Sequence, residues 1–231
     1  RDRVCLPSAV YFRWENGPDD IVVGGDAIYD NPGERVVTSI KRLMGRTFEQ
    51  AVKDNAERHF VGPVSILRES TNGLQLRVDN EEDGTHRVFW PSEISGLILR
   101  EIRRRVEGCL GTAIDGAVIT VPAYFDGPHR AATIEAARLA GIKVLAPLLD
   151  EPSAAALAFA GCVSFEPGEP VVVVDWGGGT LDVAVMETDG KTWNQLFITG
   201  ALNLGGDDID DHIAEYFLAR KNVPESIRKD R

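Results

Sequence analysis

The chain contains few cysteines, and their spacing excludes two common ways of stabilising a small fold. Its 231 residues include only Cys5, Cys109 and Cys162, with no Cys-x-x-Cys pair. An odd number of widely separated cysteines indicates neither a disulfide framework nor a zinc site. We therefore expect a reducing, cytoplasmic environment.

Positive charge and long apolar runs are also scarce. The net charge is −11, from 25 Lys and Arg against 36 Asp and Glu, so the sequence lacks the basic field that nucleic acid or anionic membrane attracts. The longest near-continuous apolar segment, residues 154–163, is too short to span a bilayer. We expect neither nucleic acid nor membrane as a partner.

Three catalytic signatures are missing as well. The four histidines, His59, His86, His129 and His212, form no His-Glu-x-x-His pair, and no Gly-x-Ser-x-Gly turn occurs. There is also no Gly-x-x-x-x-Gly-Lys-Ser/Thr loop. The last absence excludes the commonest class of ATPase.

The sequence has enough apolar residues, 43%, to bury a core in one large or two small domains. In its first part we expect short strands, one helix whose three cations form a solvated face, and an antiparallel meander. These elements are placed at residues 4–12 and 21–29 for the strands, 36–45 for the helix and 61–90 for the meander.

After Pro91, which begins a helix, strands and helices alternate as in an α/β layer. We place strands at 117–121 and 144–149, and helices at 130–140 and 153–159. A second unit then has strands at 171–175, 181–187 and 195–199 and a helix at 207–219. The loop at 166–170 is interpreted as the boundary between two lobes.

The most informative segment joins four valines to Asp175, Trp176 and a triglycine turn. The valine run predicts a strand that is covered on both faces, with Trp176 packed toward the core. Glycines allow the backbone to approach an anion closely and to direct amide groups at it. Asp175 cannot bind phosphate directly, so its expected partner is a magnesium ion. A glycine-rich hairpin with a solvated acid is the alternative.

Five motifs in order resemble the ATPase domain of the seventy-kilodalton heat-shock (Hsp70) chaperones. They are Lys41-Arg-Leu-Met-Gly-Arg46, Ile119-Thr-Val-Pro122-Ala-Tyr-Phe125, Glu151-Pro-Ser-Ala-Ala-Ala156, Asp175-Trp-Gly-Gly-Gly-Thr180 with Asp182, and Leu204-Gly-Gly-Asp-Asp-Ile-Asp210. The resemblance implies an α/β, actin-like (ribonuclease H-like) fold with two lobes of mixed sheets flanked by helices, truncated at both ends. The first lobe would span 1–165, with an inserted meander at about 11–90, and the second would start at 166–231.

The resemblance also implies an ATP/ADP and Mg²⁺ site with four catalytic residues, Lys41, Glu151, Asp175 and Thr180. Asp175 would hold the metal through water. Lys41 would reach the γ-phosphate from the other lobe. The nucleotide would be bound by Gly177, Gly178, Gly179, Thr180, Gly205 and Gly206.

Other implied roles concern signalling and partners. Pro122 and Arg130 would relay the nucleotide state to a peptide-binding domain that this chain does not include. Partners would be unfolded client proteins, J-domain proteins and nucleotide-exchange co-chaperones, in protein folding and the stress response. The family's first phosphate hairpin and late adenosine loop are not found in the sequence. Each lost contact to phosphate is worth about 1.5–3 kcal/mol, so we expect ATP binding to be weakened roughly 10²–10⁴-fold.

Two alternatives stay open from the sequence. One is another kinase of the same fold, acting on a sugar or acetate; the motifs at Lys41 and Glu151 favour the chaperone group. The other is a non-catalytic interaction module that has lost nucleotide. The missing first phosphate hairpin favours this alternative for the present chain, whereas the presence of Lys41, Glu151 and Asp175 argues against it.

Overall fold

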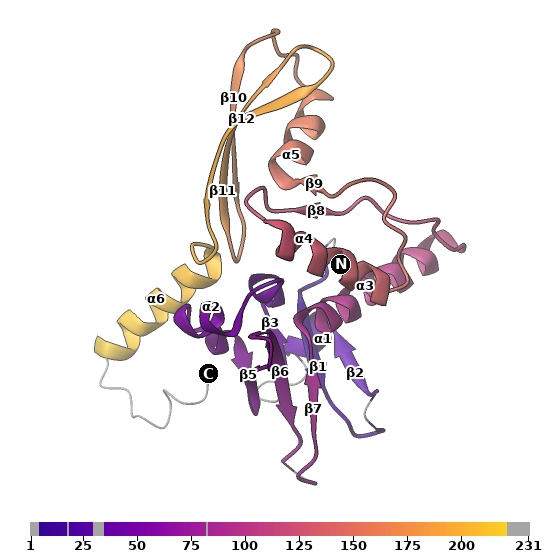
Figure 1. Cartoon of the computed structure of the whole chain (residues 1–231), viewed down its shortest axis with the longest axis vertical. Coiled ribbons are helices and arrows are strands. Elements are labelled where there is room, and N and C mark those ends of the chain that lie inside the picture. Colours follow the sequence, from indigo (N-terminus) through magenta and orange to yellow (C-terminus); the bar gives the residue numbers. More distant parts are fainter. Residues whose placement is uncertain (1–4, 18, 30–34, 82, 221–231) are drawn as a thin grey trace. The chain divides into compact units, whose positions relative to one another are not determined.

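The computed structural model describes residues 5–17, 19–29, 35–81 and 83–220. Contacts divide them into two compact units. The first unit contains the described residues up to 117 together with 127–143, and the second contains 118–126 and 144–220. Both units combine helices with small sheets (Figure 1), which confirms the predicted mixture of α and β. The lobe boundary expected near residue 166 stays a prediction.

The first unit begins with a small antiparallel sheet in the order β2-β1-β3-β4. Its strands are β1 (Ala9–Phe12), β2 (Ile21–Val23), β3 (Val36–Thr38) and β4 (Phe60–Val61). The central strand β1 is buried along its whole length, because β2 and β3 flank it and both faces are covered.

The predicted meander is confirmed as a second antiparallel sheet, β5 (Val64–Arg68), β6 (Leu74–Asp79) and β7 (His86–Phe89). Leu74, Leu76 and Val78 alternate with half-buried polar residues along β6. Their side chains join the main core with Phe89 and Ile94. One face of this sheet is therefore apolar and the other meets solvent, as period-two alternation requires.

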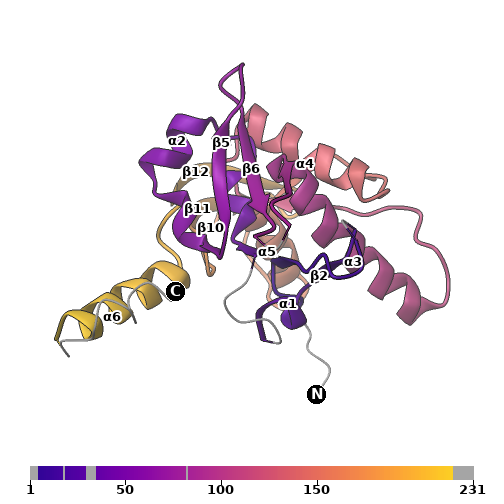
Figure 2. The ribbon, with the colours of Figure 1, turned by 90° about the horizontal axis from the view of Figure 1, so that it is seen from below.

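Helix α3 (Pro91–Leu110) packs on this core, and α4 (Gly127–Leu139) packs against α3 (Figures 1 and 2). Helix α3 begins at Pro91 as predicted, and Glu93 accepts a hydrogen bond from the Trp90 amide at 2.7 Å. Gly96 allows the close approach of the helices, since a Cβ there would lie 3.1 Å from the Leu139 Cβ.

The helix predicted over residues 36–45 is wrong. The β-branched residues at its start form β3, and only a 3₁₀ turn, η1 (Ile40–Leu43), follows. Ser39 separates the two with a left-handed φ of 51°. β-Branched residues favour extended backbone, and pairing with β1 and β4 outweighs the apolar periodicity.

The strand predicted over residues 21–29 is half correct. It ends at Val23, and a short helix, α1 (Gly25–Tyr29), takes the remaining residues. Gly24 lies between them with φ +97°, a conformation that interrupts a strand and favours glycine. The strand predicted at residues 4–12 starts only at Ala9, and residue 4 lies outside the described residues.

The second unit contains a parallel pair, β8 (Thr120–Val121) and β9 (Leu149–Asp150), and helix α5 (Glu151–Ala160). A three-stranded antiparallel sheet follows, with β10 (Pro170–Trp176), β11 (Leu181–Thr188) and β12 (Trp193–Ala201). Helix α6 (Gly206–Arg220) ends the described chain. The strands expected at 117–121 and 144–149 are thus shorter than predicted, whereas the later ones are slightly longer.

One face of β10 is exposed within the described chain. Val172 and Val174 are 61% and 60% exposed, whereas Val173 packs against the buried Ala184 and Met186. The expectation that the valine run is covered on both faces is therefore wrong for these residues, because β10 is an edge strand of a sheet with one buried face. Among the described helices, none is long and apolar enough to cross a membrane.

Candidate functional site

The triglycine segment forms the turn between β10 and β11. The strands pair up to Trp176 and Leu181, and the Gly177 amide donates to the Thr180 carbonyl at 3.0 Å. Thr180 is 8% exposed at the base of this turn. Hairpin closure thus places residues 177–180 in one tight loop, as the sequence predicted.

The second glycine motif docks onto this loop. The Gly206 amide donates to the Gly177 carbonyl at 3.0 Å, and the Asp207 amide donates to the Gly178 carbonyl at 2.9 Å. A Cβ at Gly205 would lie 2.1 Å from the Gly178 carbonyl oxygen. Only glycine fits at Gly205, because any side chain would separate the two turns. The six residues expected to bind nucleotide therefore lie together (Figure 1, lower end of β10 and start of α6).

The paired turns leave donors for an anion. The backbone bonds from Gly206 and Asp207 end on the carbonyls of Gly177 and Gly178 and do not involve the amides of Gly179 and Thr180. Among the described residues, the backbone amides of Gly179 and Thr180 have no hydrogen-bond partner. Consecutive amides in such a turn can bind phosphate oxygens.

Two carboxylates face each other across the hairpin. Asp175 and Asp182 are directly opposed in the register of β10 and β11, so their side chains share a face of the sheet. Asp182 is 1% exposed and Asp175 is half-buried. Two like charges in this position are destabilising, and a cation near the pair would relieve the repulsion.

Sequence reasoning quoted Asp182 within its motif but gave it no role. The signal that could have found it is the four-residue turn, since counting outward from residues 177–180 pairs Asp182 with Asp175. Within the described residues, no group of three or more His, Cys, Asp or Glu side chains could cage a metal. A magnesium ion would therefore need phosphate and water as further ligands, a mode that this ion favours.

Pro122 and Glu151 lie at the carboxyl end of the parallel pair β8–β9. Val121 and Asp150 are register partners, so the next residue of each strand, Pro122 and Glu151, leaves the pair at the same end. Pro122 is fully buried, and Glu151 lies half-buried in the first turn of α5. The carboxyl ends of neighbouring parallel strands are where α/β folds place functional side chains.

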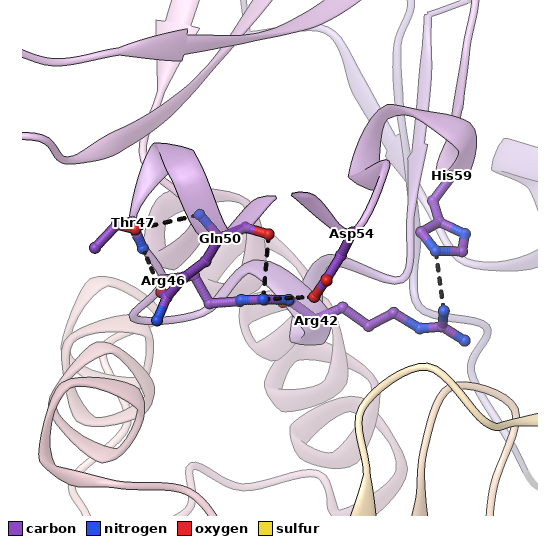
Figure 3. Close-up of polar contacts among 6 residues, drawn as sticks. All are labelled: Arg42, Arg46, Thr47, Gln50, Asp54 and His59. Carbon is purple, nitrogen blue, oxygen red and sulfur yellow. Dashed lines mark hydrogen bonds and ion pairs between the residues drawn. The ribbon is translucent and has the colours of Figure 1, made fainter. Parts of the chain in front are cut away.

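Lys41 lies in the first unit, in the 3₁₀ turn η1. Its side chain is exposed, whereas Arg42 is only 3% exposed. A guanidinium nitrogen of Arg42 lies 3.0 Å from Nε2 of His59 (Figure 3). Since arginine only donates hydrogen bonds, Nε2 of His59 is the acceptor and its ring proton is on Nδ1.

The end of this segment is fixed to helix α2 (Phe48–Lys53) and the residue that follows it. Arg46 pairs with Asp54 at 2.5 Å and also donates to the Gln50 carbonyl at 3.3 Å (Figure 3). Thr47 and Gln50 form a capping box at the start of α2. The solvated cationic face predicted for this segment is therefore wrong for Arg42 and Arg46, whose contacts lie inside the unit.

Arg130 lies in the first turn of α4, half-buried. The same helix start packs against Gly45, where a Cβ would lie 2.5 Å from the His129 nitrogen. The segment that carries Lys41 thus abuts the helix that carries Arg130. Pro122, the other predicted relay residue, belongs to the second unit.

The predicted site residues divide between the two units. The glycine turns, Asp175, Thr180 and Glu151 belong to the second unit, and Lys41 belongs to the first. The predicted meeting of Lys41 with Glu151 and Asp175 stays a prediction.

Comparison with known proteins identifies the class to which this arrangement belongs. The model of the Hsp70 protein family matches residues 2–230, so the chain belongs to the Hsp70 family. Membership implies the actin-like ATPase fold, in agreement with the resemblance drawn from the five motifs.

Several similar relatives are HscA chaperones. The chain is 37% identical over 233 residues to a chaperone protein HscA homolog of Vibrio campbellii, which covers 99% of this chain and 35% of the relative. The homolog of Vibrio parahaemolyticus is 38% identical with the same coverage. That of Histophilus somni is 36% identical over 234 residues, covering 100% of this chain and 35% of the relative. The chain spans about a third of the length of these relatives.

Proposed function

We propose that this chain forms part of the ATPase domain of an Hsp70-type chaperone, which binds ATP with Mg²⁺ and hydrolyses it as two lobes close. The observation that supports this most is the docking of the Gly205–Gly206 turn onto residues 177–180. A solvated hairpin turn has no need of a second glycine turn, whereas a phosphate cradle requires backbone that can approach an anion closely.

The chain's own residues would divide the work of phosphoryl transfer, which depends mainly on placement and charge neutralisation. The amides of Gly179 and Thr180 would bind phosphate oxygens. The Thr180 hydroxyl would lie near the transferred group. Lys41 would contribute a point charge to the γ-phosphate.

The carboxylates would act on water. Asp175 would order water bound to Mg²⁺, and Asp182, directly opposite, would strengthen the negative field that holds the cation. Glu151 would help Asp175 to position the attacking water. Bound Mg²⁺ supplies charge neutralisation on the phosphates.

The wider role follows from the family. We propose that nucleotide closure is passed through Pro122 and Arg130 to a peptide-binding domain, in a cytoplasmic chaperone that assists folding of client proteins. J-domain proteins and nucleotide-exchange factors would be its co-chaperones. HscA homologs are named as chaperones, which supports this assignment.

Titration of the 231-residue chain with Mg-ATP, followed by amide chemical shifts, tests nucleotide binding. Because weak binding is expected, millimolar ATP is needed. The expected result is a saturable shift at the amides of Gly178, Gly179 and Thr180. Absence of any shift there at millimolar Mg-ATP would contradict the proposal, and phosphorylation of added sugar or acetate would favour the kinase alternative.

The role of Lys41 is tested by measuring ATP hydrolysis in the full-length protein. Lys41→Ala should abolish ATP hydrolysis and spare most of the ATP affinity. Lys53→Ala, at another exposed lysine of the same unit, is the matched control and should retain both. Equal turnover in the two variants would refute the role of Lys41.

A further inference from the structure

Trp176 is the last residue of β10 and directly precedes the phosphate turn. Its ring is 58% exposed, and its indole N–H donates to the Leu204 carbonyl at 3.0 Å. Side chains alternate along a strand, so Trp176 lies on the face of the sheet opposite to Asp175. The expectation that Trp176 packs into the core is therefore wrong.

Leu204 is the residue before the Gly205–Gly206 turn. Hydrogen bonds thus join the two turns, among them those from Trp176 to Leu204, from Gly206 to Gly177, and from Asp207 to Gly178. The last two are between backbone groups. The bond from Trp176 comes from a side chain and spans 28 residues of sequence, so it depends on residue type, whereas the two backbone bonds do not.

The turns also leave little slack. The missing Cβ of Gly205 would lie 2.1 Å from the Gly178 oxygen, so the two backbones are in direct contact. Withdrawal of the 203–206 segment would change the position of Gly178 and the two amides beyond it. The hydrogen bond of the Trp176 side chain, on one face of the sheet, therefore affects the position of the backbone amides of Gly179 and Thr180.

We propose that Trp176 is a positioning residue, which holds the Leu204–Gly206 backbone against residues 177–180 and so aligns the amides of Gly179 and Thr180 for phosphate. This role rests on the proposed function. Trp176 itself touches no phosphate, because its ring lies on the face away from Asp175.

The test compares Trp176→Phe with Trp90→Phe in the 231-residue chain. Phenylalanine keeps an aromatic ring and removes only the indole donor. Trp90 is also exposed, at 40%, and belongs to the first unit, which makes it a matched control.

The first measurement is hydrogen exchange without nucleotide. The indole N–H of Trp176 should exchange more slowly than that of free tryptophan, and Trp176→Phe should accelerate exchange of the Gly206 and Asp207 amides by about two- to tenfold. Trp90→Phe should leave both rates unchanged. An indole that exchanges as fast as free tryptophan would overturn the proposal without any variant. Acceleration spread evenly over β10, β11 and β12 would indicate general destabilisation and would also overturn it.

The second measurement is affinity for Mg-ATP, read from the shifts of Gly179 and Thr180. Trp176→Phe should weaken it about two- to tenfold, and Trp90→Phe should not. Unchanged affinity with accelerated exchange would overturn the positioning role and leave the proposed function standing. Absence of Mg-ATP binding by the unaltered chain would overturn both the proposed function and the positioning role. The exchange data would then still show whether the hydrogen bond from Trp176 holds the two turns together.

Discussion

The segment that carries Lys41 and the segment that carries the glycine turns are held in different ways. Side chains fix the first: Arg42 contacts His59, and Arg46 pairs with Asp54. Backbone groups fix most of the second, through the bonds of Gly206 and Asp207. A segment that presents one charged side chain can be anchored by its neighbours' side chains, whereas a segment that presents its own amides must leave the backbone bare.

The largest effect should come from adding a side chain where the backbones touch. Gly205→Ala would place a carbon 2.1 Å from the Gly178 oxygen, and such overpacking costs about 1–3 kcal/mol or more. We expect loss of detectable Mg-ATP binding and a lower midpoint of thermal unfolding.

Gly161→Ala is the matched control for this change. Gly161 lies in the same unit, and a Cβ there would meet only the Ala158 oxygen at 3.4 Å. A Gly205→Ala protein with unaltered affinity and melting temperature would show that the turns do not need to touch.

The next effect should come from the side-chain anchor of the first segment. His59→Leu would leave the buried Arg42 without this acceptor, which costs about 1–3 kcal/mol. His59→Gln keeps an acceptor oxygen and should restore part of the loss in urea unfolding. His86→Leu, at an exposed histidine of the same unit, should change stability by less than about 0.5 kcal/mol.

A smaller effect of opposite sign is expected at the carboxylate pair. Asp182→Asn removes one of two opposed charges, and a neutral amide is less costly to bury. Without Mg²⁺ the second unit should become more stable by about 1 kcal/mol. The variant should also lose the stabilisation that added Mg-ATP gives. A loss of stability in metal-free buffer would mean that Asp182 serves the fold rather than a cation.

The smallest effect on stability should come from the exposed ion pairs of Glu101, and it gives a reference value against which the effects of the buried contacts can be compared. Hydrogen bonds from Arg104, and then from Arg105, hold the pKa of Glu101 at about 2, below its usual 4.5. Glu101 therefore stabilises the fold fully above pH 4.5, and this contribution is lost as the pH falls from 4.5 to about 2. Because the arginine side chains are 70% and 47% exposed, Glu101→Gln should cost only about 0.5 kcal/mol at pH 7. Acid unfolding curves of the two proteins should converge near pH 2.

The sequence predicts well what is decided locally. The alternation in β6 and the helix start at Pro91 depend on residues close together in sequence, and the structure confirms the meander and α3. The error at residues 36–45 has a different origin, since β3 exists because β1 and β4 pair with it. That pairing cannot be read from the segment's own periodicity.

The candidate site follows the same division. The glycine turns and Asp175 were predicted because a motif is local. The contact between Gly205 and Gly178, the bond from Trp176 to Leu204, and the burial of Arg42 join residues that are distant in sequence. Of the further site residues, Asp182 is the one that the sequence could predict, because counting outward from the turn at residues 177–180 pairs it with Asp175.

The alternation of β10 has a consequence for how this protein can diverge. Asp175 and Trp176 are adjacent in sequence, yet they stand on opposite faces of one strand. Mutation can therefore change the contact between Trp176 and Leu204 on one face without changing Asp175 on the other face. In a homologue without this tryptophan, we expect a different contact to hold the second glycine turn in place while Asp175 is kept.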